Sequence, residues 1–179
     1  MSKYLAYSFL YDDAGDLKCD FELFTDEIAS MIGMLCSLLD DKDRAADPYL
    51  AEDLSGINEL MYHINPSLRT RVMVSAEELE WLRVKTAQLE EAAREGLPKG
   101  RGLAFFVPQG CAQAAYSHLI RCKCKILVRL LSRYRQQGNA VDEILFDFTN
   151  LYAGYFYALA LWLNKIHGVE ERVFISRVY

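Results

Sequence analysis

The stretch ILFDFTNLYAGYFYALALWL, residues 144–163, decides the fold of this chain. Drawn as a helix it is apolar on almost every side, which is typical of a helix buried in a bundle or in a subunit interface. A run of this length could also span a bilayer. However, Asp147, Thr149 and Asn150 lie inside it, Gly154 interrupts it, and its tyrosines lie mid-span rather than at the ends. We therefore expect a buried helix of a soluble bundle and no contact with a membrane.

Four further segments carry the periodicity or the capping residues of helices. The first has apolar residues at helical spacing and Thr25 as its candidate cap. The second begins at Asp47-Pro48, with the acid as cap and the proline at the first helical position. The third opens with Ser75 and Glu78, which form the sequence of a capping box. The predicted helices cover residues 25–40, 48–64, 76–95, 111–137 and a last segment from Val141 through the apolar run.

Length and composition indicate one globular domain. The chain has 179 residues, 52% of them hydrophobic and 25% charged, which is too apolar for disorder and long enough for one core. A formal net charge of −5 gives no general attraction to nucleic acid. We expect an all-α fold, a five-helix bundle that covers residues 1–179 as a single domain.

The five cysteines indicate a reducing compartment. Their number is odd, and the first residues show no apolar signal segment, so we expect free thiols in the cytoplasm. Cys122 and Cys124 are two apart on a predicted helix and face different sides, so they cannot chelate one ion together. No zinc-type spacing occurs elsewhere, and we expect no metal site.

The helix over 111–137 carries a stripe of cations. Its members recur every fourth residue and have no acid near them in sequence: Arg121, Lys125, Arg129 and Arg133. The stripe is either an anion site for phosphate or carboxylate groups, or a solvated face that pairs with acids such as Asp26 and Glu27. The opposite side of this helix is expected to be buried, with Ala112, Ala115, Tyr116, Leu119, Ile120, Ile126, Leu127, Leu130, Leu131 and Tyr134.

Two other places could carry polar chemistry. Asp147 and Asn150 are expected to be buried in the last helix, where the acid needs a partner. They are either tied to a cation of the preceding helix or line a ligand pocket. Phe105 and Phe106 lie in a glycine- and proline-rich loop over 96–110, and they either anchor the loop or wall a flat ligand.

Three segments together carry a family resemblance. TDEIASMIG at 25–33 is similar to V-D-E-L-N-S-x-I-G, and FFVPQG at 105–110 is similar to F-I-L-P-G-G. His118 and Arg121 follow in place of L-H-x-A-R, and residues 148–164 are similar to Y-L-N-R-L-S-D and a trailing apolar run that ends in Asn. The order and intervals resemble those of the propanediol-utilisation type of ATP:cob(I)alamin adenosyltransferase.

The resemblance implies a five-helix bundle that assembles as a homotrimer and binds ATP, magnesium and a reduced corrinoid at subunit interfaces. In that family Co(I) attacks the 5′ carbon of the ribose and displaces triphosphate. By position, Asp26 and Lys125 would pair across the interface and Arg129 would contact phosphate. The implied site residues are Asp26, Phe105, Phe106 and Lys125 for the corrinoid or the interface, and Arg129 and Asn150 for phosphate or nucleotide.

Several positions depart from the family pattern. The family's triphosphate loop T-G-D-x-G-x-T has no counterpart at 12–16, Val128 replaces the Glu of R-R-A-E-R, and Leu151 and Gly154 replace the Arg and Asp of N-R-L-S-D. Loss of such fixed charges removes stabilisation of the transferring phosphates. We therefore expect a corrinoid-binding protein whose ATP-dependent transfer is weakened or lost. The alternatives are an active adenosyltransferase with a rebuilt nucleotide site, and a non-catalytic interaction scaffold.

Overall fold

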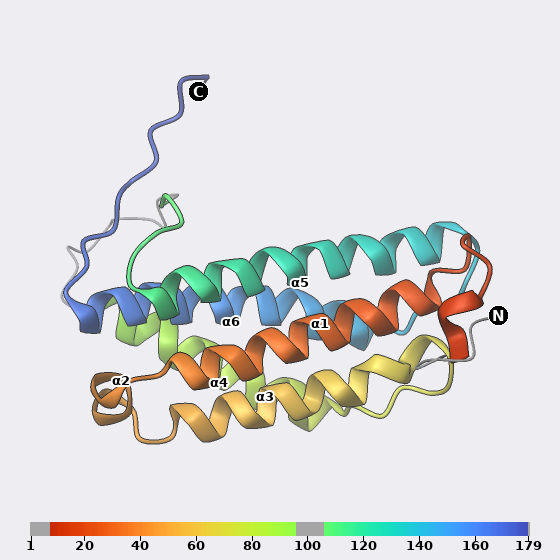
Figure 1. The fold of residues 1–179 in the computed structure, drawn as a ribbon, viewed down its shortest axis with the longest axis horizontal. Coiled ribbons are helices and arrows are strands. Elements are labelled where there is room, and N and C mark those ends of the chain that lie inside the picture. The colour runs from red at the N-terminus through yellow and green to blue at the C-terminus, as the bar shows by residue number, and fades with distance from the viewer. Residues whose placement is uncertain (1–7, 96–105, 179) are drawn as a thin grey trace.

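A computed structural model describes residues 8–95 and 106–178 of the chain, and within them the architecture is an elongated helical bundle (Figure 1). The all-α bundle expected from the sequence is therefore confirmed. Within these ranges five long helices run along the bundle, and one short helix, α2, lies at one end of it. The helices are α1 Leu17–Leu38, α2 Asp41–Ala46, α3 Leu50–Ile64, α4 Ala76–Arg94, α5 Ala112–Gln136 and α6 Glu143–His167, with short 3-10 turns at Ser8–Tyr11 and Asn65–Leu68.

The first helix is longer than its periodicity predicted. It begins at Leu17, because Asp16 caps it by accepting a hydrogen bond from the backbone N–H of Lys18. Thr25, the expected cap, lies inside the helix, where its hydroxyl donates to the carbonyl of Phe21 at 2.9 Å. A hydroxyl satisfied in this way is compatible with a helix interior, so the prediction of a start at 25 was wrong.

The junction between α1 and α3 also differs from the expectation. Asp40 and Asp43 form a capping box around the short helix α2, which the sequence reading did not predict. Asp47 makes a turn by accepting from the backbone N–H of Tyr49, so α3 begins at Leu50 and not at 48. The capping box at Ser75 is present as predicted and opens α4.

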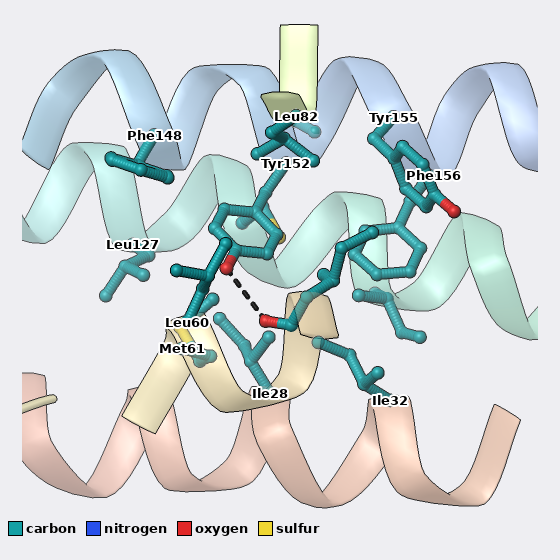
Figure 2. Packing of buried hydrophobic residues seen from close by; sticks show 14 of the residues in the cluster. Ile28, Ile32, Leu60, Met61, Leu82, Leu127, Phe148, Tyr152, Tyr155 and Phe156 are labelled. Carbon is teal, nitrogen blue, oxygen red and sulfur yellow. Dashed lines mark hydrogen bonds between the residues drawn. The ribbon is translucent and has the colours of Figure 1, made fainter. Parts of the chain in front are cut away.

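The apolar run of α6 lies in the middle of the core. Figure 2 shows Phe148, Tyr152 and Phe156 directed at side chains from the surrounding helices, and all three are fully buried. The hydroxyl of Tyr152 donates to the carbonyl of Ile57 on α3 at 2.9 Å, so its burial leaves no unpaired polar atom. Each such ring contributes roughly 1.5–3 kcal/mol of hydrophobic stabilisation. Among the described residues no helix is long and apolar enough to cross a membrane.

Two expectations about burial were wrong. Asp147 and Asn150 are exposed, because they lie with Glu143 on one narrow polar stripe at the start of α6. The amide of Asn150 donates to the carbonyl of Phe146 within the same helix, at 2.9 Å. On α5, Ala112, Leu119 and Ile126 are also exposed rather than buried.

Candidate functional site

Exposed apolar side chains mark one surface of the bundle, formed by α1 and α5. Leu23 and Met34 of α1 are 45% and 49% exposed, and Leu119 and Ile126 of α5 are 55% and 51% exposed. We call the surface formed by these four residues the α1–α5 face. Large apolar side chains gathered on neighbouring helices indicate an interaction surface.

An ion pair joins the two helices within this face. Lys123 Nζ lies 2.6 Å from Glu27 Oε1. Glu27 is four residues after Leu23 and seven before Met34, and Lys123 is four after Leu119 and three before Ile126. Such spacings place residues on one side of a helix, so the apolar side chains lie on the same side as the ion pair.

The two margins of the face carry opposite charge. On the margin toward α3, Asp26 accepts a hydrogen bond from the hydroxyl of Tyr62 at 2.9 Å, and this bond raises the pKa of Tyr62. The other margin carries three exposed cations of α5, for which the described residues provide no ion pair: Lys125, Arg129 and Arg133. Within one chain these three cations therefore form a solvated face, and the pairing with Glu27 is made by Lys123 instead.

The structure does not bring the implied acid and base together within one chain. Asp26 is bonded to Tyr62 on α3, whereas Lys125 projects from the exposed side of α5. Arg129 follows Lys125 one turn later on α5. Asn150 lies on α6, and its amide donates a hydrogen bond to a carbonyl of the same helix. The roles assigned to these four residues stay predictions.

Phe106 lies on a short segment that pairs with the chain beyond α6. It forms an isolated antiparallel bridge with Val173, and the backbone N–H of Val107 donates to the carbonyl of Arg172 at 2.8 Å. The side chain of Phe106 is half-buried. Phe105, the other aromatic residue predicted for the site, lies outside the described residues.

A buried amide fixes this segment to α6. Asn164 is fully buried; its Nδ2 donates to the carbonyl of Gln109 at 2.9 Å, and its Oδ1 accepts from the backbone N–H of Cys111 at 3.0 Å. Gly110, between these two residues, has a φ of +135°. In the sequence Asn164 stands out only as the end of an apolar run, because Gln109 and Cys111, which its amide holds, are more than fifty residues away.

His118 is a buried polar side chain on α5. It is 3% exposed, and neither of its ring nitrogens has a hydrogen-bond partner among the described residues. Burial, together with the nearby charge of Arg121, lowers its pKa to about 4, so the ring is neutral at pH 7. The guanidinium of Arg121 lies 5.5 Å from the ring centre of Tyr157, apart from the exposed cations of the stripe.

Arg69 lies at the end of the bundle where α1 begins, near the segment where the resemblance expects a triphosphate loop. Its Nε and one terminal nitrogen donate to the two oxygens of Glu22 at 2.7 and 2.9 Å, and another nitrogen pairs with Asp12 at 2.9 Å. Its guanidinium also lies 3.7 Å from the ring centre of Phe9. The positive charge of Arg69 is thus compensated by two carboxylates of the same chain.

Comparison with known proteins identifies the family of this chain. The family described as cobalamin adenosyltransferase matches residues 24–163. A variant PduO-type ATP:corrinoid adenosyltransferase from Lactobacillus reuteri, solved with cobalamin and ATP, aligns with a TM-score of 0.75 at 18% identity, over 90% of this chain and 87% of that one. A second variant from the same organism, solved with ATP, aligns with a TM-score of 0.74 at 19% identity, over 89% and 88%. No curated protein sequence matches this chain significantly. Since the family match spans most of the sequence, this chain belongs to the cobalamin adenosyltransferase family.

Proposed function

We propose that this protein binds a corrinoid where two copies of the chain meet in a homotrimer, and that its ATP-dependent adenosyl transfer is weakened or lost. Family membership and the α1–α5 face support the binding part of the proposal. The similar protein from Lactobacillus reuteri has been solved with cobalamin and ATP bound. The observation that carries the proposal is the exposed apolar surface between an acidic and a basic margin.

The charge arrangement favours contact between different sides of two copies. Asp26 of one copy would repel Asp26 of another, and the same holds for Lys125. Asp26 of one copy attracts Lys125 of the next when the copies meet head to tail. A heterologous contact of this kind closes into a ring when the rotation between copies allows it. Burial of the four apolar side chains of the α1–α5 face would add hydrophobic stabilisation to such a ring.

A corrinoid suits a site of this composition. The ligand is large and flat, and apolar walls that exclude water bind most of its surface. Phe106 would provide part of one wall, on a segment whose position is fixed by the hydrogen bonds of Asn164. A rigid wall binds more tightly than a mobile one because less conformational entropy is lost on binding.

Electrostatics oppose a triphosphate at the start of the chain. The segment from Asp12 to Glu22 carries several carboxylates, and Arg69, the cation next to it, is already paired with two of them. A polyphosphate would have to break these pairs to gain a positive contact. Val128 also provides no charge where the family motif has a Glu. Both features support weakened ATP chemistry.

The proposal is tested by absorbance titration of the purified protein with oxidised and reduced cobalamin, with and without MgATP. We expect saturable binding that is weakened at least tenfold by Ile126→Asp and by Phe106→Ala, but not by Tyr49→Ala, which alters an exposed aromatic residue elsewhere. MgATP should have little effect.

The other outcomes support different functions. Formation of adenosylcobalamin with MgATP would show an active adenosyltransferase and contradict the loss of ATP chemistry. Absence of cobalamin binding by the assembled protein in every redox state would contradict the corrinoid site and favour an interaction scaffold.

A further inference from the structure

We infer that Asp40, Asp43 and His167 form a binding site for a divalent transition-metal ion. The three residues meet where α1 ends, α2 lies across the bundle end and α6 finishes (Figure 1). One ligand atom from each lies within 4.8 Å of the other two. His167 is 124 positions from Asp43 in sequence, so only the fold brings these groups together.

One oxygen of each carboxylate is already used by the protein. Oδ2 of Asp43 accepts from the backbone N–H of Asp40 at 2.9 Å and from Nε2 of Gln113 at 3.0 Å. Oδ1 of Asp40 accepts from the backbone N–H groups of Lys42 and Asp43 at 2.9 and 3.0 Å. These bonds fix both carboxylates, as the hydrogen bonds around metal ligands commonly do.

The remaining oxygens both face one nitrogen. Oδ1 of Asp43 lies 2.8 Å from Nε2 of His167, and Oδ2 of Asp40 lies 3.9 Å from the same atom. Ligand atoms about 2.0–2.2 Å from one ion are roughly 3 Å apart, a value that these two separations bracket. Two carboxylate oxygens and one imidazole nitrogen are a donor set for zinc, cobalt or manganese.

Charge balance also favours a divalent ion. With a neutral imidazole, the two carboxylates give the cluster a charge of about −2, and Asp43 has no exposed surface. Lys42 and Arg44 of α2 are exposed, and neither makes an ion pair with the cluster among the described residues. A divalent ion would compensate both of these charges.

Access and proton balance are compatible with binding. The side chain of Asp40 is 49% exposed, so an ion can enter from solvent and keep water at its remaining positions. On binding, the ion takes the lone pair of Nε2, and any proton carried by that nitrogen is released to solvent.

The test is a titration of the full chain with Co²⁺ in the absence of corrinoid and nucleotide. We expect visible d–d absorption that saturates at one equivalent per chain and a Kd that rises at least tenfold in His167→Gln. Asp40→Asn should also weaken binding; asparagine still caps α2, so circular dichroism should show the fold retained. His63→Gln, which changes an exposed histidine paired with Glu59, is the matched control.

Two outcomes would overturn the inference: no saturable absorption with Co²⁺, or equal affinity in the parent protein and in folded His167→Gln. Because the titration contains no corrinoid, its failure would leave the proposed corrinoid function unaffected.

Discussion

A Cβ atom placed on Gly110 would lie 1.8 Å from Oδ1 of Asn164. That oxygen accepts a hydrogen bond from the backbone of Cys111, and the same amide holds the carbonyl of Gln109. Close approach and a positive φ therefore both require glycine at this position. The contact links α6 to the segment that carries Phe106.

Gly110→Ala should damage both stability and ligand binding. The added methyl must displace the amide of Asn164, and the residue must also adopt a φ that is strained for alanine. We expect a loss of about 1–3 kcal/mol in the free energy of unfolding, measured by urea denaturation, and at least tenfold weaker cobalamin binding. Gly138→Ala is the control, because Gly138 has a φ of +89° but nothing within 4 Å of the added atom. Equal losses of stability in both variants would show that the Asn164 contact contributes nothing.

Acid should destabilise the protein through His118. Its pKa is about 4 in the folded chain and 6.5 in the unfolded chain, so the unfolded state binds more protons between these values. The free energy of unfolding should therefore keep its full value above pH 6.5. It should fall by about 3 kcal/mol as the pH drops toward 4.

The variant His118→Leu should lack this pH dependence. Urea unfolding at several pH values checks the prediction, with the exposed residue in His63→Leu as the control. An unchanged slope of stability against pH in His118→Leu would rule out His118 as its origin.

Charge reversal tests the proposed ring of subunits. Asp26→Lys or Lys125→Asp alone should place like charges opposite one another and weaken the oligomer, whereas the double variant should restore it. Sedimentation velocity measures the assembly. Tyr62→Phe is the control, because it removes the hydrogen bond to Asp26 and keeps the charge. A trimer that both single reversals leave intact would place the interface elsewhere.

Removal of Arg69 should cost far more stability than removal of an exposed arginine. Arg69→Gln leaves the carboxylate of Glu22, which is only 6% exposed, without its bidentate cation. We expect the free energy of unfolding to fall by about 3 kcal/mol. Arg83→Gln removes an exposed pair with Glu80 and should cost less than about 1 kcal/mol. Similar small losses in both variants, measured by chemical denaturation, would show that Arg69 does not hold this end of the bundle.

The helix limits that the sequence predicted best are those set by residues close together in the chain. Ser75 and Glu78 are three apart and form their capping box as expected. The start of α1 was misplaced, because Thr25 has the residue type of a cap while Asp16 makes the actual hydrogen bond. Both side chains are capable of capping, and only the path of the backbone decides between them.

Sequence by itself determined the helical class, most helix limits and the family pattern, because periodicity, caps and motifs are encoded over a few residues. Tertiary structure decided what each helix side faces. In the folded chain Ile126 and Asp147 are exposed, His167 lies within hydrogen-bond distance of Asp43, and Gly110 packs against Asn164. These relationships depend on helices far apart in the chain, and burial is a property of the neighbours that surround a side chain rather than of the side chain itself.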